Sequence, residues 1–187
     1  MNYQEFEMKQ PILHTPRLKL RKITLADLPA MFAYTSLDEV TKYLPFDTHK
    51  RVEDTKLFID YVLDQYTNCR LAPWAIELQS TNTFLGTIEY VFWEQENNTA
   101  EIAFVLSNHY WGRGIITEAA REVIRFGFEE MDLERVQARC FNANIASQRV
   151  LTKNGFQFEG TLRKRLFSKG KQQDIRVYSL LRQEYSM

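Results

Sequence analysis

The most informative stretch of the sequence is Trp111-Gly112-Arg113-Gly114-Ile115-Ile116-Thr117. Two of the chain's seven glycines stand here, one residue apart. Glycine lets the backbone approach a ligand closely and adopt positive φ angles. A helix that begins at this point adds backbone N–H donors and a partial positive charge. The stretch therefore predicts a seat for a phosphate or pyrophosphate, with Arg113 as an additional charge.

The motif alone does not identify the phosphate ligand. The Walker pattern G-x-x-x-x-G-K-[ST] is absent, and the dinucleotide pattern G-x-G-x-x-G fails at Thr117. A bare G-x-G before a helix is more often an ordinary tight turn than a binding loop. The surrounding sequence has to decide between these two interpretations.

The residues after this loop predict the strongest helix of the chain. Apolar residues recur there at helical spacing, at Ile116, Ala119, Ala120, Val123, Ile124 and Gly127. Charged residues take the other side, at Glu118, Arg121, Glu122 and Arg125. This pattern is typical of a helix with one face against a core.

The rest of the chain predicts an alternation of strands and helices. We expect strands at 17–21, 74–78, 84–93, 100–106, 135–141, 157–167 and 174–181. We expect further helices at 24–34, 38–43, 52–66 and 145–153. This order predicts an α/β (α+β) fold with a mixed sheet and helices on its faces. Since no repeat or linker interrupts the sequence, we expect a single domain over residues 1–187.

Composition excludes several classes of protein. Lys and Arg number 24, as do Asp and Glu, so the net charge is zero and no direct nucleic-acid binding is expected. The first 20 residues lack the apolar run of a signal peptide, and no apolar stretch is long enough to span a membrane. Two cysteines cannot form a disulfide framework, so we expect free thiols in a cytoplasmic protein.

Several stretches, in the same order, resemble the GNAT superfamily of N-acetyltransferases. They are Ala100-Glu101-Ile102-Ala103-Phe104-Val105-Leu106, the run from Trp111 to Ala119, Asn142-Ala143-Asn144-Ile145-Ala146-Ser147 and Val150-Leu151-Thr152-Lys153-Asn154-Gly155-Phe156. The last two look like the Rim-type (RimJ/RimL-like) branch, which acetylates the N-termini of ribosomal proteins. Thr15-Pro16-Arg17-Leu18-Lys19-Leu20-Arg21 resembles the opening strand of that branch. The resemblance extends from about Thr15 to Tyr185.

The resemblance implies a mixed, mostly antiparallel sheet that splays open at its centre, between strands 100–106 and 135–141. Acetyl-CoA would lie in the opening as co-substrate, and no metal would be required. The residues implied in its binding are Phe104, Val105, Leu106, Trp111, Gly112, Arg113, Gly114, Ile115, Ile116, Thr117 and Asn144.

Transfer of an acetyl group to an amine requires removal of a proton from the amine and protonation of the leaving thiolate. Glu101 is the expected base, because a carboxylate in an apolar strand is costly unless it is paired or used; an ion pair with a neighbouring Arg or Lys explains it equally well. Glu89 is the second candidate base. Many family members use a Tyr as the acid, but Leu151 occupies that position here. Ser147 is therefore the expected acid, although a serine near a helix start often bonds the backbone instead.

The acceptor pocket is expected among irregular segments and aromatic residues, with Tyr43, Phe46, Glu89 and Trp93 as the substrate-binding candidates. Aromatic residues at these positions are equally typical of a core. No cluster of His and Cys has metal-ligand spacing, so no metal site is expected.

The resemblance implies an N-acetyltransferase that acts on a protein N-terminal α-amine. A small amine, such as a drug or polyamine, is the alternative acceptor; a peptide predicts an open, mildly acidic cleft and a small amine a closed pocket. A catalytically silent acyl-CoA-binding module is a further alternative, supported by Leu151, and a scaffold without a ligand would make the ordered motifs a coincidence. The sequence leaves monomer and homodimer open.

Overall fold

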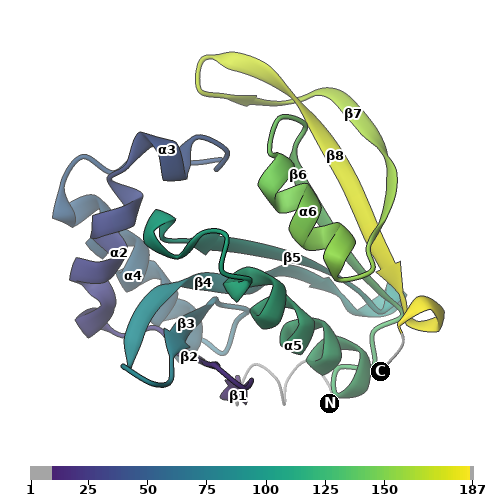
Figure 1. Ribbon diagram of the computed structural model, residues 1–187, viewed down its shortest axis with the longest axis horizontal. Helices are drawn as coiled ribbons and strands as arrows, with labels where there is room; N and C mark the ends of the chain where they lie inside the picture. Colours follow the sequence, from purple (N-terminus) through teal and green to yellow (C-terminus); the bar gives the residue numbers. More distant parts are fainter. Residues whose placement is uncertain (1–9, 186–187) are drawn as a thin grey trace.

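The computed structural model describes residues 10–185, which build an eight-stranded mixed sheet with helices on both faces (Figure 1). The strands lie in the order β1-β2-β3-β4-β5-β6-β8-β7. Their bounds are β1 Leu13–His14, β2 Leu18–Lys22, β3 Trp74–Leu78, β4 Thr83–Glu94, β5 Thr99–Leu106, β6 Arg135–Phe141, β7 Gln157–Ser168 and β8 Lys171–Leu181. Neighbouring strands are antiparallel except β5 and β6, which are parallel. The expected mixed, mostly antiparallel sheet is confirmed.

The α-helices are α2 Leu28–Thr35, α3 Asp38–Thr41, α4 Val52–Thr67, α5 Ile115–Glu129 and α6 Ile145–Lys153. The expected helix over 24–34 is divided: a 3-10 turn, η1 (Leu25–Asp27), precedes α2. Pro29 lies in the first turn of α2, where its missing N–H costs nothing. Further 3-10 turns are η2 Gln95–Asn97, η3 Asn108–Tyr110 and η4 Arg182–Glu184. Within residues 10–185, no helix combines the length and apolar composition that crossing a bilayer requires.

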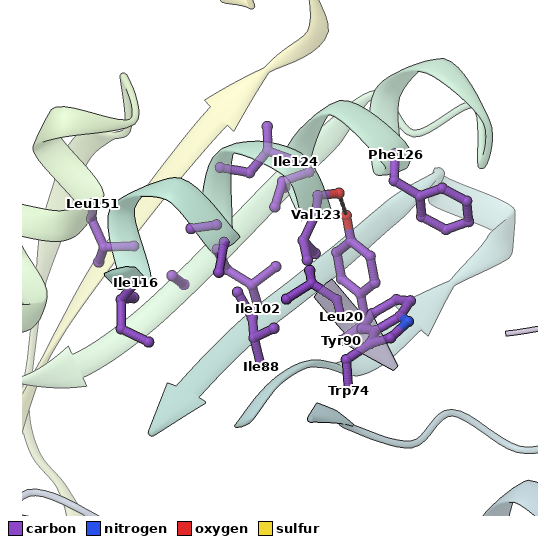
Figure 2. Packing of buried hydrophobic residues seen from close by; sticks show 14 of the residues in the cluster. Leu20, Trp74, Ile88, Tyr90, Ile102, Ile116, Val123, Ile124, Phe126 and Leu151 are labelled. Carbon is purple, nitrogen blue, oxygen red and sulfur yellow. Dashed lines mark hydrogen bonds between the residues drawn. The ribbon is translucent and has the colours of Figure 1, made fainter. Parts of the chain in front are cut away.

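Two hydrophobic clusters lie on opposite faces of the sheet. Because side chains alternate along a strand, Trp74 and Ile76 join the cluster beneath α5, whereas Ala75 joins the cluster beneath α2 and α4. Figure 2 shows the first cluster, in which the Tyr90 hydroxyl donates a hydrogen bond of 2.7 Å to the carbonyl of Val123 on α5. This bond satisfies the one polar atom of a fully buried ring and fixes α5 over the sheet.

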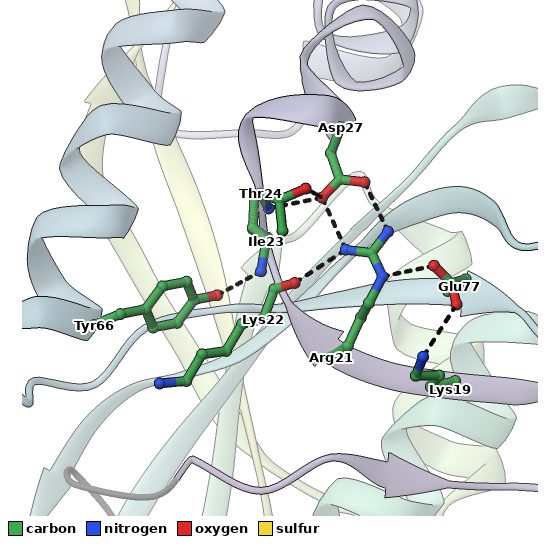
Figure 3. A network of polar contacts seen from close by, with 8 residues as sticks. All are labelled: Lys19, Arg21, Lys22, Ile23, Thr24, Asp27, Tyr66 and Glu77. Atoms are coloured by element: carbon green, nitrogen blue, oxygen red, sulfur yellow. Dashed lines mark hydrogen bonds and ion pairs between the residues drawn. The ribbon is translucent and has the colours of Figure 1, made fainter.

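A charged network joins the first strands to the start of the helical segment (Figure 3). The Arg21 guanidinium donates two hydrogen bonds, of 2.8 and 2.7 Å, to the carboxylate of Asp27. Its Nε donates to Glu77 on β3 at 2.6 Å. Burial alone would raise the pKa of Asp27, but hydrogen bonds from Arg21 and Thr24 outweigh it and hold this pKa below its ordinary value. The network fixes where the chain leaves β2 to form α2.

The sheet opens between β5 and β6. The two strands pair only at Thr99 with Arg135, Ala100 with Val136 and Glu101 with Gln137. Beyond Glu101 this edge of β5 has no strand partner, although β5 continues to Leu106. Backbone N–H and C=O groups need partners when they are shielded from water, so the opening is suited to an extended ligand that pairs with the strand. The expected splay is confirmed at the expected strands.

Replacing Gly127 in α5 tests how tightly α5 packs on the sheet. A Cβ at this position would lie 2.2 Å from the Tyr90 hydroxyl oxygen and 3.0 Å from Leu133 Cδ1. Alanine normally stabilises a helix over glycine by about 1 kcal/mol, whereas overpacking costs about 1–3 kcal/mol. We expect Gly127→Ala to lower the free energy of unfolding in urea by about 1–2 kcal/mol.

Gly160→Ala is the control, because its Cβ would meet no atom within 4 Å; we expect a change below about 0.5 kcal/mol. Adding Tyr90→Phe to Gly127→Ala should restore part of the loss. A more stable Gly127→Ala protein would contradict the assigned contact.

Candidate active site

Two cavities meet where the sheet opens. The larger cavity, of about 600 Å³, lies between the 111–117 loop, the end of β5 and α6. The smaller cavity, of about 360 Å³, lies between β5, β6, α6 and the β7–β8 hairpin. Both are lined by Tyr43, Leu44, Phe104, Asn144 and Ser147. A ligand that lies in the larger cavity can therefore extend into the smaller one at these shared residues.

The expected phosphate seat has the geometry of a binding loop. Gly112 and Gly114 have φ angles of 74° and 73°, in the left-handed region that glycine adopts without strain. Gly114 is the residue before the first turn of α5, so the free N–H groups of that turn follow it directly. Both glycines line the larger cavity, and a Cβ at Gly112 would meet no atom within 4 Å. The loop thus offers backbone donors and open space to an anion.

Polar contacts from Thr15 and Arg17 support the 111–117 loop. Glu118, in the first turn of α5, accepts a hydrogen bond of 2.5 Å from the Thr15 hydroxyl and one of 2.6 Å from Arg17 Nε. Arg17 Nη1 also donates to the carbonyl of Arg113 at 3.1 Å. The ion pair with Arg17 compensates the negative charge of Glu118 near the expected phosphate site. It also connects the N-terminal Thr15-Pro16-Arg17 motif to the loop.

Three basic side chains that the sequence did not single out line the larger cavity: Lys42, Arg149 and Lys153. Arg149 and Lys153 are four residues apart on α6, so they share one helix face. Arg113 itself does not line the cavity, and its guanidinium lies 5.4 Å from the centre of the Tyr110 ring. With Glu39 as the one acidic residue in the lining, the three basic side chains make the larger cavity net positive. The spacing of the two α6 residues was the available sequence signal.

Asn144 and Ser147 stand at the junction of the cavities, at the start of α6. The Asn144 side chain accepts a hydrogen bond of 3.2 Å from the Ser147 backbone N–H and caps the helix. The Ser147 hydroxyl makes no hydrogen bond to any group within residues 10–185. The backbone N–H of Ser147 therefore serves the helix, and Ser147 lines both cavities.

Glu101 lines the smaller cavity, and its side chain is only 6% exposed. Arg139 Nε donates to its two carboxylate oxygens at 2.8 and 2.9 Å, and Gln137 Nε2 donates to one of them at 2.8 Å. These bonds explain how an apolar strand tolerates the charge. The ion pair that the sequence left as the alternative to a catalytic role is present, and it leaves the carboxylate facing the cavity.

The four substrate-binding candidates separate in space. Tyr43 lines both cavities, whereas Phe46, Glu89 and Trp93 line neither. Phe46 packs its ring 5.4 Å from that of His49, and Trp93 packs against the cluster beneath α5. Glu89 is half-buried on β4, where burial raises its pKa to about 7. Its basicity would suit proton transfer near neutral pH, but its position away from the cavity does not.

The smaller cavity carries more positive than negative charge. Arg139 and Arg165 line it together with Glu101. Outside the lining, Lys169 Nζ in the turn between β7 and β8 donates to the carbonyl of Phe46 at 2.5 Å. The cavity is therefore not the mildly acidic cleft that we expected for a peptide acceptor. Among the described residues, no group of three or more His, Cys, Asp or Glu side chains is arranged to hold a metal ion.

Comparison with known proteins agrees with this geometry. The model of the acetyltransferase (GNAT) domain family matches residues 17–157. The uncharacterized N-acetyltransferase YoaA of Bacillus subtilis (strain 168) is 37% identical over 172 residues, which are 92% of this chain and 97% of that protein.

Solved structures of acetyltransferases share the fold. A GNAT-family acetyltransferase from Bacillus anthracis has a TM-score of 0.84 and 30% identity over 93% of this chain and all of that one. RimL, a ribosomal L7/L12 α-N-protein acetyltransferase in complex with coenzyme A, has a TM-score of 0.81 at 20% identity, over 91% of this chain and 98% of that one.

The family uses acetyl-CoA as its acetyl donor. Family match, relatives and splayed sheet agree, and the chain belongs to the GNAT acetyltransferases as an N-acetyltransferase.

Proposed function

We propose that this enzyme transfers the acetyl group of acetyl-CoA to the α-amine of a protein N-terminus, as the Rim-type branch does. The observation that carries the proposal is the junction of the two cavities at Phe104, Asn144 and Ser147. A donor in the larger cavity and an acceptor in the smaller one would meet at these residues. The likeness of the opening strand and of the 142–156 segment to the Rim-type branch supports an N-terminal acceptor.

Two parts of acetyl-CoA, the pyrophosphate and the extended arm, would lie in the larger cavity. The pyrophosphate would accept hydrogen bonds from the loop at Gly112 and Gly114 and from the first turn of α5. Lys42, Arg149 and Lys153 would add charge to the phosphate end. The extended arm would pair with the edge of β5 beyond Glu101, which β6 leaves free.

The reaction needs one bond made and one broken. The neutral amine nitrogen attacks the thioester carbon, the C–N bond forms, and the C–S bond breaks with its electron pair on sulfur. The amine proton passes to Glu101 or to cavity water, and the Ser147 hydroxyl gives its proton to the thiolate and regains one from water. The products are the acetylated amine and CoA. Little base strength is required, because an α-amine has a pKa of about 8.

A small amine is the second candidate acceptor. A volume of about 360 Å³ is typical of a small-molecule site. A panel of N-terminal peptides, lysine peptides, polyamines and aminoglycosides, with CoA release as the readout, separates the two. Turnover restricted to small amines would keep the chemistry and overturn the N-terminal acceptor.

Gly112→Ala and Gly170→Ala form a matched pair that tests the phosphate seat. Both glycines have φ of 74°, and a Cβ on either meets nothing within 4 Å. Both variants should therefore lose similar stability, about 1 kcal/mol. Only Gly112→Ala places a methyl group in the seat, so we expect it alone to weaken acetyl-CoA binding, by about tenfold, in isothermal titration calorimetry. Equal affinity of the two variants for acetyl-CoA would show that this loop does not bind the pyrophosphate.

Ser147→Ala tests the proton donor. We expect kcat to fall about 100-fold, because the thiolate would leave without its acid, while the Kd for acetyl-CoA changes much less. Ser80→Ala, in the exposed turn between β3 and β4, is the control and should leave kcat at the wild-type value. An unchanged kcat in Ser147→Ala would assign protonation of the thiolate to water.

The pH profile distinguishes an α-amine from a lysine acceptor. Only the neutral amine attacks, so kcat/KM for a peptide with a free N-terminus should rise with pH and level off above about 8. A lysine acceptor would continue to rise towards about 10.4. The comparison uses one peptide with a free N-terminus and blocked lysines, and a second peptide with a blocked N-terminus and a free lysine. Faster turnover of the lysine form at every pH would contradict the proposed acceptor.

A further inference from the structure

One positive charge in the lining of the smaller cavity has no ion-pair partner within residues 10–185. Five ionisable side chains line it: Tyr43, Glu101, Arg139, Cys140 and Arg165. Both oxygens of Glu101 are bonded by Arg139, so these two charges compensate each other. Burial raises the pKa of the Cys140 thiol to about 11, which keeps it neutral at physiological pH. Arg165, which is exposed to solvent, remains as the one charged residue of the lining without an ion pair among the described residues.

A bulge in β7 brings Arg165 to this wall. Leu162 pairs with Ile175 and Leu166 pairs with Gln173, so three residues of β7 stand opposite Asp174 alone. Within the bulge, Lys164 adopts a φ of 50°, and its backbone N–H donates to the Asp174 carboxylate at 2.8 Å. The carboxylate of Asp174 thus holds the bulge in place.

The bulge has a consequence for side-chain direction. In a regular strand, adjacent side chains point to opposite faces. The three residues of the bulge interrupt this alternation, and Arg165, the last of them, lines the smaller cavity together with Leu166. Bulges near active sites commonly alter the direction of a side chain.

Arg165 is available for a ligand. Within residues 10–185 its guanidinium makes no ion pair and no hydrogen bond, in contrast to Arg139 and Arg135, which pair with Glu101 and Glu159. Arg163, in the same bulge, also has no ion pair among the described residues, but it does not line the cavity. Arginine binds carboxylates through two parallel N–H donors, and one such contact would compensate the charge of the wall.

We propose that Arg165 selects acceptors that carry a carboxylate close to the reacting amine, namely N-terminal peptides with an acidic residue in their first positions. This inference rests on the proposed function and specifies its substrate class. A free acidic amino acid offers the same chemistry, and the experiment separates it from a peptide. Polyamines and aminoglycosides, which bring further positive charge, would be disfavoured by the same wall.

The test compares kcat/KM for three peptides that begin with serine and carry glutamate, alanine or lysine at the second and third positions. The variants are Arg165→Gln, Arg165→Lys and Arg165→Glu, with Arg163→Gln as the control that removes the same charge from the same bulge. We expect the wild type to favour the acidic peptide over the neutral one by about tenfold. The ratio should approach one in Arg165→Gln, recover partly in Arg165→Lys, and favour the lysine peptide in Arg165→Glu.

The Arg163→Gln protein should keep the wild-type ratio. Equal turnover of all three peptides by the wild type, or equal loss of preference in Arg163→Gln and Arg165→Gln, would overturn the role of Arg165 and leave the N-terminal acceptor standing. Acetylation of free glutamate or aspartate but of no peptide would support the carboxylate preference and overturn the peptide acceptor. Acetylation of polyamines alone would overturn both.

Discussion

The separation of β5 from β6 is the constraint on which the rest of the site depends. The two strands are parallel and pair over three residues only, and the continuation of β5 has no strand beside it. A sheet normally closes such an edge with another strand. Here α5 and α6 cover the opening on one face, so the gap becomes a passage between two cavities.

Rigid packing keeps this passage open. The buried ring of Tyr90 bonds the backbone of α5 and fills the space above Gly127, which fixes the helix against the sheet. Glu118 and Arg17 then tie the first turn of α5 to the N-terminal strand region. The 111–117 loop directly precedes the contact at Glu118. Its two glycines, Gly112 and Gly114, are in the left-handed region.

Electrostatics divides the site into two functional ends. The end nearest the loop combines backbone donors with Lys42, Arg149 and Lys153, as a phosphate-rich donor requires. The other end pairs Glu101 with Arg139 and leaves Arg165 without an ion pair among the described residues. A cationic wall around an amine acceptor is unfavourable unless the acceptor supplies negative charge of its own. The charge distribution thus bears on the choice of acceptor as well as on the affinity for the donor.

The sequence by itself determined the fold class and a glycine loop at the start of the strongest helix. These two features are local or follow from element order, because periodicity and turn chemistry act over a few residues. The splay between strands 100–106 and 135–141 was implied by the resemblance to the family. Asn144 and Ser147 were expected in the site through resemblance to the family, and the structure places both in the lining of the two cavities. Only the tertiary structure placed Phe46, Glu89 and Trp93 outside the cavities and brought Arg165 to the wall. That placement depends on strand register and on a bulge held by Asp174, which are set by contacts between strands and leave no periodic trace in the sequence.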